Sequence, residues 1–280
     1  MDKIEGLLDG NGWVSVELVS PEKPPHEDHT RDYIIAKAAR ASTGMGLKTV
    51  QEDKRLIKYL VKHHHTSPLE MANITFCIKC PIAIGRQFLR HRTGKFNEFS
   101  QRYSEVREEM DRYHLDKDPD SVRGQSKMNA QSSEYNLSEK DQEEIKKIIQ
   151  DMETMQDKIY QGYQKLLDRG LTREVSRFYL PLSTYTVFFV QFDLNNLMKF
   201  LSLRCAPDAQ KEIRVYADAM KILAKKYFPI TMEAFEEEQE KMVLDKMAIK
   251  MIQEKKIPEV KSKSQKKTLQ EISEILNLDL

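Results

Sequence analysis

The sequence predicts a mixed α+β fold, and three observations support this prediction. Short runs rich in β-branched and aromatic residues predict strands at 13–19, 72–80 and 184–192. Longer runs with apolar residues three and four apart predict helices along most of the remaining chain. Hydrophobic residues make up 40% of the 280 residues, enough for a core. Glycine is scarce, with 10 residues, and no Gly-rich phosphate loop occurs.

The first half of the chain alternates between these element types. Turn residues at 9–12 precede the strand at 13–19, in which every second residue is apolar. Helices are predicted at 28–41, after Pro24-Pro25, and at 53–62. The strand at 72–80 is stopped by Pro81, which also opens a helix at 82–92.

The second half begins with a charged stretch at 104–144 that is poor in apolar residues, and we interpret it as a surface insertion. The amphipathic pattern predicts a long helix at 145–168. It should end there, because Arg169-Gly170 is a typical helix end. A short helix at 172–178, the strand at 184–192 and helices at 195–204 and 208–228 follow. Residues 1–240 would form the domain. Residues 241–280 would be a charged extension, lysine-rich at 255–267, with a short docking helix expected at 268–278.

Charge and composition exclude several protein classes. Lys and Arg total 45 against 44 Asp and Glu, so the net charge of +1 argues against a strongly basic nucleic-acid binder. The N-terminal residues do not resemble a signal peptide, and no apolar run is long enough to span a membrane. We therefore expect a cytoplasmic protein. Of its three cysteines, Cys77 and Cys80 form a C-x-x-C, either two strand residues on opposite faces or a redox pair.

The densest chemistry lies in residues 85–103. Five basic side chains and one acidic side chain give this segment a local charge of +4, hidden in the neutral total. In its helical half, Gln87 and His91 stand four residues apart and share a face, as Arg86 and Arg90 do.

After Gly94 we expect an extended chain, in which alternate side chains point in opposite directions. Glu98, Ser100 and Arg102 would then lie on one side and could hold a phosphate and a sugar together. Arginine binds phosphate through two parallel hydrogen bonds, a hydroxyl adds a donor, and a carboxylate accepts from sugar hydroxyls. The alternative is an ordinary solvated charged face. The opposite side would carry Asn97, Phe99, Gln101 and Tyr103.

Arg204 is a second, independent candidate. It falls on the apolar stripe of the helix at 195–204, where a guanidinium needs a carboxylate, a phosphate or a carbonyl as partner. A bound anion and a structural salt bridge are both open. Arg173 and Arg177 raise the same question, and we expect one of them to pair with Glu174.

The histidines at 63–65 suggest a metal site, but adjacent residues at a helix end point apart. We expect a helix C-cap with one functional imidazole, and no metal ion. Ser100 has no nucleophile elbow around it, so a binding hydroxyl is the better interpretation.

The run Arg90-His91-Arg92, seven further residues and then Ser100, followed by Arg102, resembles the signature of the flavin-dependent thymidylate synthases. Four other stretches fall in the order and spacing of that family: KHHHTSPLE, RQFLRHR, TREVSRFYLPLSTYT and LMKFLSLR. The resemblance covers about residues 10–235.

The resemblance implies a central, mostly antiparallel sheet flanked by helices, with long helices on one side. It implies reductive methylation of dUMP to dTMP, in which methylenetetrahydrofolate supplies the carbon and NADPH reduces a bound FAD. It also implies a homotetramer whose active sites are shared between chains, with no membrane or nucleic-acid partner.

The same resemblance implies individual roles. Arg204 would hold the uracil and favour ionisation at its N3 position, and His65 would lie near the flavin ring. The implied dUMP contacts are Gln87, Phe88, Leu89, Arg90, Glu98, Phe99, Ser100, Gln101, Arg102, Arg177 and Arg204. The implied FAD contacts are Ser67, Arg90, His91, Arg92, Glu98, Asp193, Asn195 and Lys199.

Three of these flavin contacts depart from the family's pattern. Where an Asn-x-Arg-Ser stretch is common, this chain has Asp193-Leu194-Asn195-Asn196, and Lys199 stands one turn later. Met71 and Asp208 replace common histidines. The alternative function is therefore a nucleotide-binding or RNA-binding relative that has lost flavin chemistry.

Overall fold

The structure is a computed structural model that describes residues 2–44, 46–106, 112–118, 120–127 and 133–239. Nearly all of these residues belong to one compact unit, Met1–Glu236. Of the second unit, Glu237–Leu280, only residues 237–239 are described. The lysine-rich segment at 255–267 and the docking helix expected at 268–278 lie outside the described residues.

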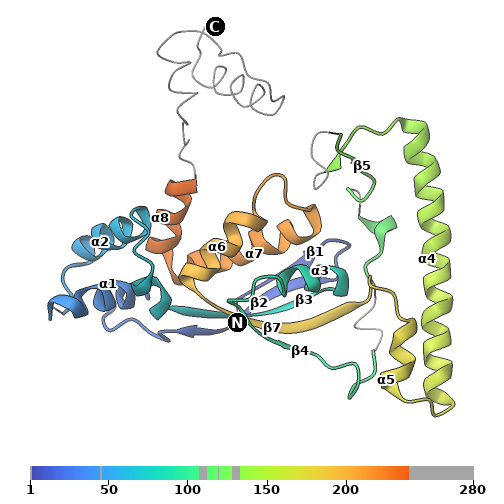
Figure 1. The fold of residues 1–280 in the computed structure, drawn as a ribbon, viewed down its shortest axis with the longest axis horizontal. Helices are drawn as coiled ribbons and strands as arrows, with labels where there is room; N and C mark the ends of the chain where they lie inside the picture. The colour runs from blue at the N-terminus through green and yellow to red at the C-terminus, as the bar shows by residue number, and fades with distance from the viewer. Residues whose placement is uncertain (1, 45, 107–111, 119, 128–132, 240–280) are drawn as a thin grey trace, which may run out of the picture. The chain divides into compact units, whose positions relative to one another are not determined.

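A five-stranded antiparallel sheet forms the centre of the first unit, in the order β1-β2-β3-β7-β4 (Figure 1). The three expected strands are confirmed as β2, β3 and β7. The sequence pattern does not predict β1, a short edge strand with a glycine inside it. The strands are β1 (Lys3–Leu7), β2 (Gly12–Ser20), β3 (Asn73–Pro81), β4 (Lys95–Glu98) and β7 (Tyr185–Asp193).

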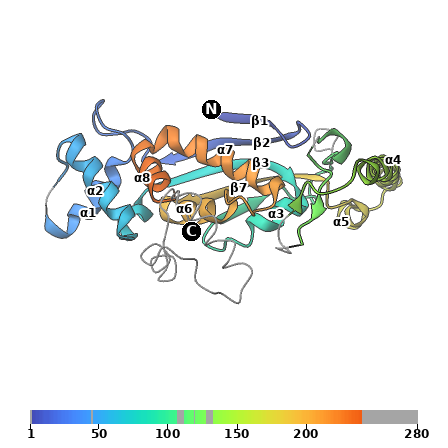
Figure 2. The same ribbon diagram turned by 90° about the horizontal axis from the view of Figure 1, so that it is seen from above.

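One face of this sheet carries the core. Cross-strand pairs such as Phe76 with Val190 and Ile78 with Phe188 are buried there. The helices α3 (Ile82–Phe88), α6 (Leu194–Arg204) and α7 (Lys211–Tyr227) cover this face, as Figures 1 and 2 show. The C-x-x-C spans the two faces as expected, since Cys80 lies in this core and Cys77 points to the other face.

The helices α1 (Tyr33–Arg40), α2 (Val50–Lys62) and α8 (Pro229–Gln239) lie at one end of the sheet (Figure 2). α1 begins later than the predicted 28, and α2 begins before the predicted 53 because Thr49 and Glu52 form a capping box. We did not predict α8, because Pro229 suggested a stop; proline also fits the first position of a helix. The buried Asp32 carboxylate accepts hydrogen bonds from Thr231 and the Ile230 N–H, which ties α1 to α8.

The long helix α4 (Glu139–Asp168) begins six residues before the predicted 145. The Ser138 hydroxyl caps it by accepting from the Asp141 N–H at 3.2 Å. α4 runs along the opposite end of the unit from α1 and α2, beside the short helix α5 (Arg173–Ser176) (Figures 1 and 2).

The expected surface insertion at 104–144 is anchored to the core rather than free. It contains a short two-stranded sheet, β5 (Gly124–Gln125) and β6 (Ser133–Glu134), and its last residues belong to α4. Its Asp118 is buried and pairs with Lys211 of α7 at 2.6 Å. Arg123 pairs with Glu212 of the same helix. Among the described helices, none combines the length and the apolar character that crossing a bilayer requires.

Candidate functional site

The corner between α3 and β4 carries the R-H-R run. α3 ends at Phe88, so these residues lie in the turn after the helix, not in its predicted extension to 92. The Phe88 ring is fully buried and stacks on Phe200 of α6 with ring centroids 5.2 Å apart. At Gly94 a Cβ atom would lie 2.7 Å from the ring of Phe192, so a larger residue would require this buried ring to shift. The corner is therefore held by aromatic packing beneath it.

The cations of this corner are exposed. Arg86, Arg90 and Arg92 all lie at the surface, and within the described ranges none of them forms an ion pair. Unpaired guanidinium groups on one short segment are available to an anionic ligand. Of the five basic side chains behind the +4 charge of the sequence, these three are therefore not neutralised by a carboxylate of a described residue.

Arg204, at the C-terminal end of α6, contacts this corner directly. Its Nε–H donates to His91 Nε2 at 3.0 Å, and the His91 ring lies edge-on to Phe200 with centroids 4.8 Å apart. No carboxylate pairs with Arg204 among the described residues, so the structural salt bridge that the sequence left open is not formed there. The two terminal nitrogens of the guanidinium remain for a ligand.

The electrostatics of this pair follow from its geometry. Burial, reinforced by the Arg204 charge, lowers the pKa of His91 from its ordinary 6.5 to about 4. The ring is therefore neutral near pH 7, which allows Nε2 to accept the hydrogen bond. Burial also lowers the pKa of Arg204, although a guanidinium stays charged. The result is a half-buried cation held in place by a neutral acceptor.

A pocket of about 590 Å³ opens beside Arg204. Gln87 of α3 lines it, and its Nε2 donates to Gln210 Oε1 at 2.5 Å. Gln210 is a lining residue that the sequence did not indicate, because it stands alone before α7 without a motif. The remaining lining residues are Ser202, Leu203, Ala206, Asp208 and Ala209.

A second, smaller pocket of about 230 Å³ lies between α3, β4 and β7. Leu89 and Glu98 line it, and Glu98 Oε1 accepts from the Thr186 hydroxyl at 2.7 Å. Phe99 continues the strand pairing, since its N–H donates to the Val187 carbonyl at 2.8 Å. The alternation that we expected to continue to 103 stops here.

From Ser100 the chain turns instead of staying extended. The Ser100 carbonyl accepts from the N–H groups of Tyr103 and Ser104, and its hydroxyl accepts from the Arg102 N–H at 3.3 Å. This local hydrogen bonding by serine competes with strand geometry. Glu98, Ser100 and Arg102 therefore do not form the regular row that the sequence predicted, and Gln101 lies within the turn.

Arg102 pairs with Glu174 of α5 at 3.3 Å. Glu174 thus pairs with Arg102 and not, as we expected, with Arg173 or Arg177. Both partners are about half exposed, at 53% and 52%, and such surface pairs are worth at most about 1 kcal/mol. Arg177 follows α5 directly in a 3₁₀ turn. In both views α5 lies beside α4 and separate from α6, so these two arginines form a different group from Arg204 and Gln87 (Figures 1 and 2).

A third group lies around the N-terminus of α6. Asp193 caps this helix, because its Oδ1 accepts from the Asn196 N–H at 2.9 Å. The buried Asn195 donates to Glu70 at 3.3 Å, in the 3₁₀ helix Ser67–Met71. Asp193 and Asn195 therefore have structural partners. Lys199, on the same helix, is exposed.

The three histidines form the expected helix C-cap. The His65 N–H donates to the Leu60 carbonyl and the His64 N–H to the Val61 carbonyl, with His64 at φ +55°. This is the hydrogen-bond pattern of a Schellman motif. It leaves the His65 ring exposed at the end of α2, next to Ser67 in sequence.

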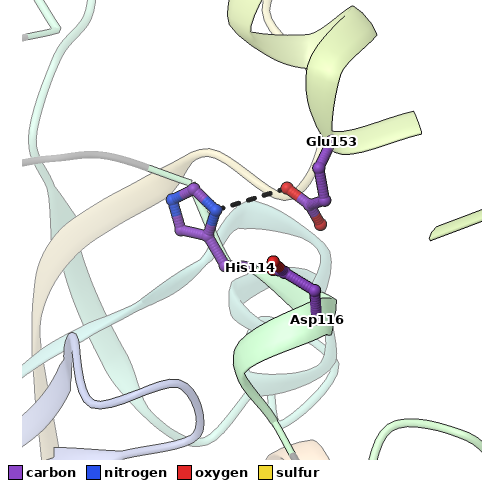
Figure 3. Close-up of side chains that lie close together, drawn as sticks. All are labelled: His114, Asp116 and Glu153. Atoms are coloured by element: carbon purple, nitrogen blue, oxygen red, sulfur yellow. Dashed lines mark ion pairs between the residues drawn. The ribbon is translucent and has the colours of Figure 1, made fainter. Parts of the chain in front are cut away.

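A different set of side chains could approach a metal ion. The ligand atoms of His114, Asp116 and Glu153 lie within 4.8 Å of one another (Figure 3). The Glu153 carboxylate already accepts from Arg112 at 3.0 Å and from the Leu115 N–H at 3.1 Å. Because a buried guanidinium stands beside the carboxylate, the arrangement is that of an ion-pair network between α4 and the insertion.

Both the sequence and the fold of this chain are similar to those of known proteins. The family model described as thymidylate synthase complementing protein matches residues 26–230. A flavin-dependent thymidylate synthase of Thermus thermophilus is 45% identical over 206 residues, which cover 74% of this chain and 72% of that protein. The protein of the same name from Dictyostelium discoideum is 40% identical over 225 residues, 80% of this chain and 71% of that one.

Among solved structures, the UMP/dUMP methylase PolB from Streptomyces cacaoi, bound with 5-Br dUMP, superposes with a TM-score of 0.65. It is 31% identical, and the match covers 81% of this chain and 95% of that one. The antiparallel sheet with its covering helices is therefore the fold expected from the resemblance. On the family model and on these identities, the chain belongs to the thymidylate synthase complementing protein family, which includes flavin-dependent thymidylate synthases.

Proposed function

We propose that this protein makes dTMP from dUMP by reductive methylation, in the cytoplasm. Methylenetetrahydrofolate would supply the carbon, and NADPH would reduce a bound FAD. The names of the relatives support a flavin and thymidylate synthesis. The dUMP analogue in the related methylase supports a uridine nucleotide as substrate.

The observation on which this proposal depends is the placement of Arg204. A half-buried guanidinium, fixed by His91 and without a carboxylate among the described residues, opens onto a pocket that also contains Gln87. A fixed cation next to a uracil carbonyl stabilises negative charge on the ring. Arg204 would thus favour loss of the N3 proton, and Gln87 would hold the base edge.

The residues available for FAD fit an anionic cofactor. Arg90 and Arg92 are exposed and without ion pairs in the described part of the chain, as a diphosphate would need. His65 and Ser67 lie at the exposed end of α2. When bound, the flavin would supply the hydride. Asp193 and Asn195 are engaged in capping and in packing, so we assign them to the scaffold around that site.

The proposed site is shared between copies of the chain. Arg102 and Arg177 lie at the α5 end, whereas Gln87 and Arg204 lie between α3 and α6 (Figure 1). We infer that within one chain these groups do not converge on one nucleotide. Large exposed side chains beside Arg177, such as Phe178 at 78% and Tyr179 at 63% exposed, support a covered face there. We infer a homotetramer in which one subunit completes the site of another.

The test is dTMP formation by the full-length protein. Purified protein with dUMP, methylenetetrahydrofolate, NADPH and FAD should form dTMP, and leaving out any one component should abolish the product. Visible absorption of the protein after loading with FAD should show bound flavin. Protein that binds dUMP but neither flavin nor folate would contradict the proposal.

The exposed arginines also fit the alternative function, a nucleotide-binding or RNA-binding relative that has lost flavin chemistry, and binding measurements can test it. RNA binding whose affinity falls steeply with salt, without any turnover, would favour the nucleic-acid-binding relative. The same titration with dUMP separates this outcome from a nucleotide-binding relative.

A further inference from the structure

We propose that α4 is a self-association helix that pairs antiparallel with α4 of a second copy of this chain. This proposal deepens the self-association inferred above by assigning one interface to one helix. It does not depend on the enzyme activity, because it is argued from α4 alone.

The first observation is an exposed apolar stripe. Ile148, Met152, Met155 and Ile159 follow one another at spacings of four, three and four residues, and are 61%, 50%, 54% and 39% exposed. Ile145 lies three residues before Ile148, and Leu166 lies seven residues after Ile159, with Gly162 at the position between them. Alternating steps of three and four place side chains along one seam of a helix, as in coiled coils. Such a contiguous apolar stripe on a surface marks an interface.

The second observation is that a different face of α4 packs on its own chain. The Tyr163 hydroxyl accepts from the Val106 N–H at 3.1 Å, and Gln156 accepts from the Ser183 hydroxyl at 2.8 Å. At 3.6 residues per turn, Tyr163 and Gln156 lie roughly 60° around the helix from the centre of the stripe. The stripe is therefore not needed to hold α4 in place.

The third observation is the charge beside the stripe. Glu144, Asp151, Lys158 and Lys165 recur every seven residues along the flank away from the packed face, and all four are exposed. Glu144 has only a long contact to Lys140, 3.9 Å, and none of the other three forms an ion pair with a described residue. The flank is acidic in its first half and basic in its second half.

This distribution selects the antiparallel arrangement. With Met152 of one copy opposite Met155 of the other, Ile148 lies opposite Ile159, and the seam is symmetric about a two-fold axis. In that same register, Asp151 faces Lys158 and Glu144 faces Lys165, so every flanking charge meets its opposite. A parallel pair would bring each charged flank against the other copy's packed face, which its own chain already covers.

Sedimentation velocity of full-length variants tests the pairing. We expect Asp151→Lys and Lys158→Asp each to weaken the α4 interface by about tenfold or more, because each change places like charges opposite each other at two symmetric positions. The double variant D151K/K158D should recover wild-type assembly, since it restores opposite charges. Met155→Lys should dissociate the interface. Glu143→Lys, an exposed charge change on the other side of α4, is the matched control and should leave the mass unchanged.

Three results would overturn the proposal. One is wild-type protein that sediments as a monomer, and another is an assembly that the single exchanges leave intact. The third is cross-linking mass spectrometry that joins Lys158 to residues 240–280 of the same chain, because the chain's own extension would then cover the stripe. Sedimentation and cross-linking do not depend on dTMP formation. A protein that forms no dTMP would therefore contradict the proposed function without affecting the test of the α4 interface.

Discussion

At the scale of single residues, the environment of Arg204 differs from that of the other arginines. It is half-buried and hydrogen-bonded to a neutral imidazole, whereas Arg102 has an exposed carboxylate partner. A guanidinium that keeps its full charge near a pocket is suited to polarise a ligand. Substitutions at Arg204 and at Arg102 should therefore have different effects.

Arg204→Lys should reduce dTMP formation by about 10²–10³-fold, because a lysine keeps the charge but loses the planar fork that His91 orients. Initial rates at saturating dUMP measure the effect. Arg169→Lys, at the exposed C-terminal end of α4, is the matched control and should keep the wild-type rate. Full activity of the Arg204 variant would show that this side chain does not act on the substrate.

His91 predicts a pH dependence of stability. Its pKa is about 4 in the folded chain and near 6.5 when unfolded, so the unfolded state binds more protons between these values. The contribution of His91 to the free energy of unfolding should therefore fall as the pH decreases from about 6.5 to about 4. His91→Gln keeps an acceptor for Arg204 but does not titrate, so its free energy of unfolding should lack this part of the slope. Parallel urea titrations across the window compare the two proteins, and identical pH slopes would refute the assignment.

At the scale of elements, helix ends position the candidate site. Asp193 caps α6 and Arg204 is its last residue, so this helix of 11 residues separates the cap from the pocket by about 16 Å. The flavin contact that the resemblance implies at Asp193 coincides with this cap. Capping alone explains an acid here, because carboxylates are preferred at helix N-termini.

Asp193→Ala should destabilise the protein by about 1 kcal/mol, because the Asn196 N–H loses its acceptor. Asp193→Asn should be close to wild type, since asparagine is an equally good cap. Chemical denaturation of both variants measures the difference. If Asp193→Asn proves as damaging as Asp193→Ala, the negative charge rather than the cap is important.

At the scale of the whole described unit, the insertion is joined to the pocket by hydrogen bonds. Arg123 pairs with the buried Glu212, and Glu212 accepts from Gln210 at 2.8 Å. Gln210 in turn accepts from Gln87. The insertion, α7 and α3 thus form one connected polar network behind the site.

Arg123→Met should destabilise the protein by about 3–5 kcal/mol, because it leaves the Glu212 carboxylate buried without its cation. The double variant R123M/E212Q should recover most of this loss, because no buried charge then remains unpaired. Lys146→Met, which breaks only an exposed pair with Glu143, serves as the control with an effect below about 1 kcal/mol. Equal stability of the single and double variants would mean that this ion pair is not coupled.

Most elements were predictable, because their periodicity is local. The strands β2, β3 and β7 and the helices α6 and α7 appear close to their expected bounds. Apart from β1 and α8, which the sequence pattern missed, the differences lie at element ends. α3 stops at Phe88 because the next residues turn, and α4 starts early because Ser138 caps it. Element ends depend on single hydrogen bonds, to which periodicity is insensitive.

The α+β class, the family resemblance and the arginine-rich segment at 85–103 can be read from residue type and spacing alone. Which arginines have partners is visible only in the folded chain: Arg102 pairs with Glu174 and Arg204 donates to His91, whereas Arg90 and Arg92 have no ion-pair partner in the described ranges. Folding also brings Gln210 beside Gln87 from 123 positions away. The physical reason is that ion pairs and pocket walls form between residues far apart in sequence, and their energies depend on distance and burial.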